Sequence, residues 1–366
     1  MRTIRLAAIL FVLLPTLASA AEPRIFIMGV WPNRLRLFDE TSEEFVGELG
    51  LHHGAVTTYT VTAHTPDYER LFFVTDRMES VEVVDPSRRE VVDELKISTP
   101  GRRVRIFAVA PNATGNLLYL HARGTRLEND RFVREPFELL LYDLDAHEVK
   151  ETVRLPDEVK LDFLDTLTVS RDGGSLFIIG KDVYELSTET HEILDVITWS
   201  RPSSPGYGSV QVTGTVFTES EPGILYGTYQ TTDPALHKSM SGLVRLDLNT
   251  KRFESFELGP ALNVTSFSLS PDGAYGFAGI GDMAVIDMKS RRIIVRKKNF
   301  ERGRTNNTII VSADGTEIYV TGVGDSMQVY DARTLALRRV INIGADIMSA
   351  PLPLPRSAIT ASSANR

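Results

Sequence analysis

The sequence predicts an all-β protein built from seven similar units. Each unit has an apolar run of strand length that ends in an acidic residue before a polar turn, and these acids are 40 to 62 residues apart. They are Asp39, Asp85, Asp143, Glu185, Asp247, Asp287 and Asp331. A turn rich in Pro, Asp, Asn and Gly precedes most of them and leads into another apolar run, such as LFFVT or LFIIG. The acid at the strand end and the preceding turn thus recur in the same order along the chain. Repetition of this kind in an all-strand sequence indicates a seven-bladed β-propeller of four-stranded antiparallel blades.

Residues 263–295 are the clearest unit. Thr265–Leu269, Tyr275–Gly279, Met283–Ile286 and Arg292–Val295 are short runs separated by polar turns, the first of which is Pro-Asp-Gly. Runs of this length that alternate between apolar and polar residues predict antiparallel strands. A single four-stranded meander cannot bury both of its faces, so neighbouring units are expected to cover them.

The two ends of the chain predict how the ring closes. Arg24–Val30 reads as a second strand with no first strand before it, whereas Asp346–Leu354 is a surplus segment at the other end. We therefore expect the surplus segment to form the innermost strand of the first blade. Pro351 and Pro353 count against a strand here, because Pro cannot donate to a ladder, but an innermost strand has a free edge where Pro is tolerated.

The N-terminus reads as a secretory signal. Arg2 and Arg5 precede an apolar run to about Leu17, and Ala18-Ser19-Ala20 matches a cleavage site. The run is too short to span a bilayer, so we expect a periplasmic protein that does not enter the membrane. The expected division is a signal peptide at residues 1–20, a propeller at 21–356 and a disordered tail at 357–366.

Composition excludes several classes of function. The formal net charge is −8, and it becomes −10 once residues 1–20, with two arginines and no acid, are removed. Such an acidic chain is a poor nucleic-acid binder, because Lys and Arg must neutralise phosphates. The chain has no cysteine, which excludes disulfides, covalent haem attachment through C-x-x-C-H, iron–sulfur ligation and a Cys nucleophile.

Two units are longer than the others, and their insertions predict where a partner or substrate binds. Arg123–Pro136 and Gln230–Ser241 both fall between the second and third strands of their units, so both should emerge on one face of the disc. The alternative is that they are merely long hairpins. Together with Trp199–Tyr207 and with Tyr229, which directly precedes the second insertion, they supply the candidate contact residues Arg123, Arg126, Arg131, Arg134, Trp199, Tyr207, Tyr229, Asp233, His237 and Lys238.

No catalytic or metal-binding constellation is evident. There is no G-x-S-x-G motif, and of the seven histidines only His52 and His53 are adjacent. Neighbouring strand residues point to opposite faces, so this pair is expected to lie in a solvated loop and not to chelate a metal. The basic stretch Ser290–Arg304 reads either as a patch that attracts an acidic partner or as a protected outer edge.

A resemblance to a known family comes from several short motifs in a shared order. These are the SPDG turns of YVTN-type repeats, PN-x-L-x-x-x-D from Pro32 to Asp39, STP-x-x-RV from Ser98 to Val104, LYD ending at Asp143, Trp199, the Asp233-Pro234 insertion before GLVRLDL, and YDARTL from Tyr330 to Leu335. In this order they resemble the β-propeller subunit of quinohaemoprotein amine dehydrogenase over nearly the whole mature chain.

The resemblance implies a scaffold that carries no cofactor of its own. In that family a small subunit bears a tryptophylquinone, a dihaem cytochrome c subunit bears the haems, and primary amines are oxidised. We would then expect the insertion-bearing face to dock the quinone subunit. The same face would form part of the wall of the pocket that holds a small primary amine. The alternative is a stand-alone secreted YVTN-type propeller that binds a protein, peptide or glycan; an independent hydrolase or lactonase lacks the residues it would need.

Overall fold

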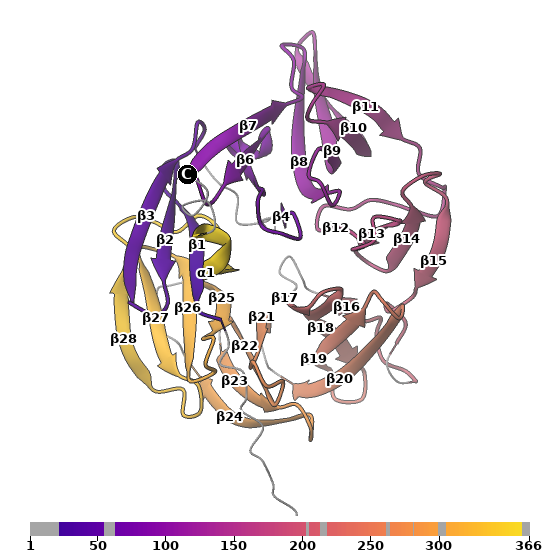
Figure 1. The fold of residues 1–366 in the computed structure, drawn as a ribbon. Helices are drawn as coiled ribbons and strands as arrows, with labels where there is room; N and C mark the ends of the chain where they lie inside the picture. The colour runs from indigo at the N-terminus through magenta and orange to yellow at the C-terminus, as the bar shows by residue number, and fades with distance from the viewer. Residues whose placement is uncertain are drawn as a thin grey trace, which may run out of the picture.

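Seven antiparallel sheets stand in a ring around a central channel in the computed structural model (Figure 1). The structure describes residues 22–54, 63–202, 205–212, 218–260, 264–280, 282–298 and 305–360. Its only helical segments within these ranges are the short 3-10 turn η1 (Asp76–Met78) and helix α1 (Arg356–Thr360). No helix in the described ranges combines the length and apolar character needed to cross a membrane.

From the second sheet onward, the strands of each sheet follow chain order from the channel to the rim. The first two sheets contain β29 (Leu352–Pro355), β1 (Arg24–Val30), β2 (Arg34–Asp39) and β3 (Glu44–Gly50), then β4 (Ala63–His64), β5 (Leu71–Thr75), β6 (Ser80–Asp85) and β7 (Glu90–Lys96). The third and fourth contain β8 (Arg102–Pro111), β9 (Leu117–Glu128), β10 (Arg131–Asp143) and β11 (Glu148–Val153), then β12 (Thr166–Val169), β13 (Ser175–Ile179), β14 (Val183–Ser187) and β15 (Ile193–Ile197).

The fifth sheet differs from the rest because two short strands share its innermost position. Both β16 (Gln211–Val212) and β17 (Thr218–Glu221) pair with β18 (Ile224–Asp233), which is followed by β19 (Lys238–Asp247) and β20 (Arg252–Pro260). The last two sheets contain β21 (Val264–Leu269), β22 (Tyr275–Ile280), β23 (Asp282–Asp287) and β24 (Arg292–Lys298), then β25 (Thr305–Val311), β26 (Glu317–Val323), β27 (Ser326–Asp331) and β28 (Leu337–Asn342).

The C-terminal segment occupies the innermost position of the first sheet. Strand β29 pairs antiparallel with β1, so that Leu354 lies opposite Ile25. The paired strand begins at Leu352, later than the expected Asp346. The preceding residues are also bound to the first sheet, through a bridge between Ile347 and Val30 and a hydrogen bond of 2.8 Å from the Met348 N–H to the Gly29 carbonyl, but these contacts do not form a continuous strand. Pro353 is accommodated within this innermost strand.

The start of the expected disordered tail is ordered. Residues 356–360 form α1, in which Ile359 is buried in the core shared by the first and second sheets. An ion pair of 3.2 Å joins the Arg356 guanidinium to the carboxylate of Asp39. Burial of Ile359 and this ion pair stabilise the folded form of the segment. The expected signal peptide at 1–20 and residues 361–366 lie outside the described residues.

Seven hydrophobic clusters hold the sheets together, and each cluster joins two neighbouring sheets. One of them packs Phe26 and Phe38 of the first sheet against Tyr319 and Met327 of the seventh. The ring of contacts therefore includes the first and last sheets. Face-to-face packing of successive four-stranded sheets is the arrangement of a seven-bladed propeller.

The repeated acids end strands by capping turns, as expected. Asp331 Oδ1 accepts the backbone N–H groups of Arg333 and Thr334 at 3.0 and 2.8 Å. Glu185, which departs from the pattern, is buried instead: its carboxylate accepts the Ser175 hydroxyl at 2.6 Å and pairs with Lys251 of the fifth sheet at 2.8 Å. The longer Glu185 side chain therefore links the fourth and fifth sheets, whereas the aspartates in the other units cap turns.

Candidate functional site

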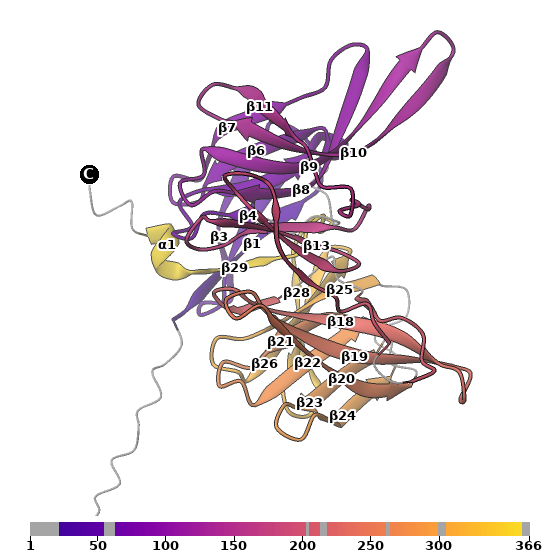
Figure 2. The same ribbon diagram turned by 90° about the vertical axis from the view of Figure 1, so that its right-hand side faces the viewer.

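Both long insertions emerge on the same face of the ring. Connections from second to third strands and from one sheet to the next lie on this face, which we call the loop face. The β9–β10 and β18–β19 hairpins protrude there, whereas α1 lies on the opposite side (Figure 2). The shared position of the insertions in their units therefore predicted their shared face correctly.

The loop face carries more exposed apolar side chains than the opposite face of the ring. Of the fifteen large hydrophobic side chains exposed in the described ranges, seven lie on the outermost strands and only Tyr275 lies at a turn of the opposite face. The other seven belong to the loop face: Trp31, Leu127, Phe132, Phe163, Leu164, Leu236 and Val323. Phe132, at the tip of the β9–β10 hairpin, is 77% exposed. Exposed apolar groups on one face make that face the candidate contact surface.

The four arginines expected on the β9–β10 hairpin fall into two groups. Arg126 pairs with Glu135 at 2.7 Å and Arg131 pairs with Glu128 at 3.3 Å, so these two charges are compensated within the hairpin. Neither Arg123 nor Arg134 has a carboxylate within ion-pair distance among the described residues.

The β18–β19 hairpin is a compact turn organised by Asp233. Its carboxylate accepts the backbone N–H groups of Ala235 and Leu236 at 2.8 and 3.1 Å and the Tyr207 hydroxyl at 3.1 Å. His237 adopts a φ of 49° in the turn, and Lys238 is exposed beside it. Asp233 and Tyr207 thus shape the hairpin, and the exposed Lys238 remains available to a partner.

Two of the aromatic candidates are buried between the fourth and fifth sheets. Trp199 is 1% exposed, and its indole N–H donates to the carbonyls of Gly180 and Lys181 at 3.1 and 2.8 Å. Tyr229 is also 1% exposed, and burial raises the pKa of its hydroxyl to about 12. Because core packing occupies both side chains, neither forms part of the exposed surface. The sequence did not distinguish buried from exposed aromatics here.

A buried acid and a buried base lie where the third and fourth sheets meet. His121 is fully buried against Phe107 and Phe137, and neither ring nitrogen meets the geometry of a hydrogen bond to another described residue. Burial lowers the pKa of His121 to about 4, and the nearby charge of Arg123 lowers it further. The imidazole is therefore neutral near pH 7. Burial has the opposite effect on Asp165, whose pKa it raises to about 6.

Sequence reasoning did not single out His121 or Asp165. His121 lies on β9 beneath the projecting hairpin, and Asp165 lies in the loop that enters the fourth sheet. The only signal for the loop is DFLD at 162–165, in which Phe163 and Leu164 are half exposed between two acids. Apolar residues flanked by charge are easily read as a surface loop.

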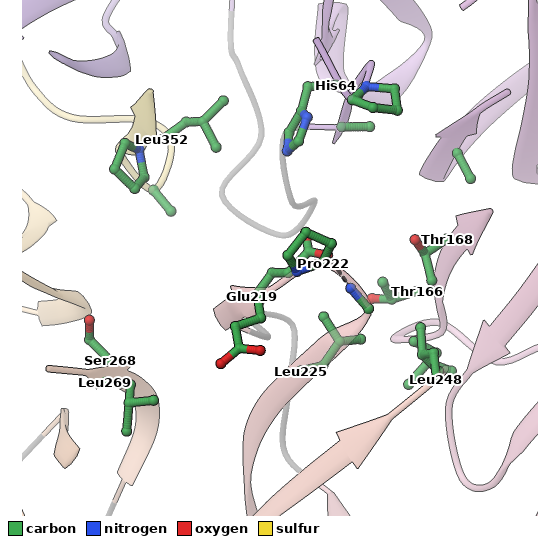
Figure 3. Close-up of a pocket in the computed structure, with 18 of the residues that line it drawn as sticks. His64, Thr166, Thr168, Glu219, Pro222, Leu225, Leu248, Ser268, Leu269 and Leu352 are labelled. Atoms are coloured by element: carbon green, nitrogen blue, oxygen red, sulfur yellow. Dashed lines mark hydrogen bonds between the residues drawn. The ribbon is translucent and has the colours of Figure 1, made fainter. Parts of the chain in front are cut away.

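The innermost strands enclose a channel of about 880 Å³. Figure 3 shows His64, Thr166, Glu219 and Ser268 around it, contributed by different sheets. His64 stacks on Tyr68 with ring centroids 4.5 Å apart, and Glu219 accepts a backbone N–H of its own turn at 2.7 Å. In the described lining, no nucleophile is hydrogen-bonded to a base. The channel can admit a small molecule but shows no arrangement for covalent catalysis.

Within the described ranges, no group of three or more His, Asp and Glu side chains is placed to hold a metal. His52 and His53 do not simply extend into solvent as expected. Their rings both contact the carboxylate of Glu94, at 3.2 and 2.6 Å. The backbone N–H groups of the same two residues donate to Glu82, which is fully buried. The pair therefore fixes the loop after β3 against the second sheet.

The basic stretch Ser290–Arg304 is partly compensated by carboxylates where it is described. Arg291 pairs with Glu254 at 2.8 Å and Arg296 with Asp282 at 2.5 Å. The Lys297 ammonium donates to the Leu335 carbonyl at 3.0 Å. Residues 299–304 lie outside the described residues. These pairings favour the protected outer edge over an attractive patch.

Comparison with solved structures places the chain among propeller-containing proteins. Hydrazine synthase of Kuenenia stuttgartiensis is similar over 93% of this chain and 100% of that chain, with 14% identity and a TM-score of 0.51. Dihydro-heme d1 dehydrogenase NirN, in complex with DHE, is similar over 92% of this chain and 75% of that chain, with 13% identity and a TM-score of 0.54. The fold is a β-propeller.

Identities this low establish the propeller architecture alone. No protein-family model and no curated protein matches the sequence. The resemblance to quinohaemoprotein amine dehydrogenase therefore stays an expectation.

Proposed function

We propose that the protein is the periplasmic propeller subunit of a quinohaemoprotein amine dehydrogenase-type complex. It acts as a scaffold without a cofactor of its own, and its loop face docks a small subunit that bears a tryptophylquinone. A dihaem cytochrome c subunit completes the complex, and the loop face helps to wall the pocket in which a primary amine is oxidised. The order of the sequence motifs supports this choice among propeller functions.

The observation that carries the proposal is the segregation of exposed apolar side chains. Apart from those on the outermost strands, all but one of the large ones in the described ranges lie on the loop face. A stable protein interface needs an apolar centre with a polar rim. Trp31 and Phe132 would supply anchors of the kind that dominate binding energy, and the two projecting hairpins of the third and fifth sheets would flank the partner.

The test is purification of the tagged chain from its native periplasm. We expect a haem-containing protein and a small quinone-positive protein to co-elute, and we expect the complex to oxidise primary amines with an artificial electron acceptor. A chain that elutes as a monomer without either partner would contradict the proposal and favour the stand-alone binding propeller.

Matched substitutions separate the loop face from general surface effects. Leu127→Asp and Leu236→Asp each place a charge on the loop face at a side chain that is 54% exposed. Ile294→Asp is the control, because Ile294 is also 54% exposed but lies on the outermost strand β24. We expect the first two variants to lose the partners and the control to retain them.

A further inference from the structure

In the described part of the chain, three arginines on one side of the third sheet, at the base of the β9–β10 hairpin, lack a carboxylate partner. The strand register places Arg105 opposite Arg123 and Arg134 opposite Thr125. Since Arg123 and Thr125 are two positions apart on the same strand, all three arginines project to the same side of the sheet. Among the described residues, no carboxylate lies within 4.0 Å of their guanidinium groups. We call Arg105, Arg123 and Arg134 the arginine patch.

Neighbouring arginines show that carboxylates are not scarce here. Arg102 contacts Glu135 and Glu138 at 2.7 and 2.5 Å, and Arg103 contacts Glu79 at 3.3 Å. With Arg126 and Arg131, four of the seven arginines at this end of the third sheet are neutralised. The three that remain belong to an acidic chain of net charge −8. The arginine patch is therefore a local reversal of the overall charge.

Aromatic side chains hold the central arginine of the patch in place. The Arg123 guanidinium lies 4.2 Å from the ring centroid of Phe137 and 5.4 Å from that of Phe107. Stacking on aromatic faces leaves the edges of a guanidinium free for bidentate hydrogen bonds to a carboxylate. Phe163, half exposed, packs against Phe107 with centroids 5.3 Å apart and extends the apolar surface beside the patch.

Mutual repulsion within the patch shows that an anion would be favoured there. Burial lowers the pKa of Arg123, and the charges of Arg134 and Arg105 lower it further. Asp162 opposes this effect but lies beyond ion-pair distance. A bound carboxylate would relieve the repulsion and would gain strength from the partly buried setting.

We propose that the arginine patch binds an acidic segment of the protein that docks on the loop face, with an apolar side chain of that segment packed on Phe163. This inference rests on the proposed docking function and names the chemistry of the partner surface. An acidic protein segment is favoured over a nucleic acid or an anionic membrane because the patch is small and lies within an otherwise acidic chain, which would repel an extended polyanion.

The test uses the double variant Arg105→Ala/Arg134→Ala in the full chain. Both residues are exposed, so their removal leaves the core intact, whereas Arg123 is kept because it packs on two rings. Arg131→Ala is the matched control, since Arg131 is an exposed arginine of the same hairpin that is already paired with Glu128. Unchanged thermal unfolding would show that each variant is folded.

We expect the double variant to bind the purified partner about tenfold more weakly or worse, with a shallower dependence on NaCl, and the control to bind within about twofold of the parent. A double variant that binds like the parent, while Leu236→Asp abolishes binding, would overturn the inference and leave the proposed function intact. If no partner co-purifies, the proposed function fails, and hexaglutamate then serves as the probe.

With hexaglutamate, salt-sensitive binding by the parent and the control but not by the double variant would support an acidic ligand at the patch. Equal binding by all three proteins would overturn it. Binding of the parent to phosphatidylglycerol vesicles without binding to hexaglutamate would also overturn it.

Discussion

The carboxylate of Asp165 fills the space that a side chain at Gly180 would occupy. A β-carbon at position 180 would lie 1.9 Å from Asp165 Oδ1. The closeness of these two residues explains how an acid can be buried at the junction of two sheets. Among the described residues, the one hydrogen bond to this carboxylate comes from the Asp162 backbone N–H at 2.7 Å, so desolvation dominates and the pKa rises.

Asp165→Asn should stabilise the protein at neutral pH. The folded-state pKa of about 6 exceeds the ordinary value of 3.8, so the parent loses stability as the pH rises from about 4 to about 6. This loss is at most ~3 kcal/mol. The uncharged Asn keeps the oxygen that accepts the Asp162 N–H and avoids the loss. Urea unfolding should therefore show the variant to be more stable at pH 7.5, with the difference vanishing near pH 4.

The variant and the parent must be compared at the same pH, because both contain His121. The titration of His121 changes stability with pH in the opposite direction to that of Asp165. Because the pKa of His121 is lowered from 6.5 to about 4, the contribution of this residue to the stability of the folded protein is fully present at pH values above 6.5 and is lost as the pH falls toward 4. Asp172→Asn is the control, since hydrogen bonds from Ser170 and Gly174 lower the pKa of this exposed carboxyl. That variant should be no more stable than the parent at pH 7.5. An Asp165→Asn variant whose stability relative to the parent does not change with pH would refute the account.

Gly242→Ala should destabilise the fifth sheet. The new β-carbon would lie 2.2 Å from the Tyr229 ring and 2.5 Å from the Phe256 carbonyl oxygen. Because Tyr229 is locked in the core, relief requires a shift of the backbone, and we expect a cost of about 1–3 kcal/mol. The measurement is the urea midpoint, with Gly50→Ala as the control because nothing lies within 4 Å of the corresponding β-carbon. Equal midpoints for the two variants would show that this packing is looser than described.

Leu354→Ala tests the contribution of the C-terminal strand. Leu354 is fully buried in the cluster shared by the first and second sheets, although it lies twelve residues from the end of the chain. We expect a loss of about 2–5 kcal/mol in the free energy of unfolding. Leu337→Ala, on the exposed side of β28, should change it by less than about 0.5 kcal/mol. A loss as small as that of the control would mean that β29 contributes little.

The repeat could be predicted from sequence because its signals are local. Turn residues such as Ser270, Asp272 and Gly273 bond within one turn, and alternation fixes which face of a strand is buried. These signals place the strands, the capping aspartates and the face on which both insertions emerge. The start of β29 was missed because proline and small residues give no periodicity at the chain's end.

The candidate site was harder to predict because it depends on which distant residues meet. Arg123 and Arg126 are the same residue type, and the sequence alone does not distinguish their roles. In the structure, only Arg126 lies beside Glu135 across the hairpin. The opposing pKa shifts of His121 and Asp165 follow from burial between two sheets, which no single segment encodes. Trp199 reads equally well as a surface anchor or a core residue until the carbonyls that accept its N–H are known.

The pairing of β29 with β1 has a consequence for biogenesis. During synthesis the N-terminal strands emerge first, and the inner edge of β1 lacks the hydrogen-bonded neighbour seen in the folded chain until residues 346–355 arrive. An open strand edge is a template for aggregation. Chains stalled late in synthesis should therefore be the most prone to aggregate, and a holdase that shields this edge would act between the emergence of the first strand and that of the last.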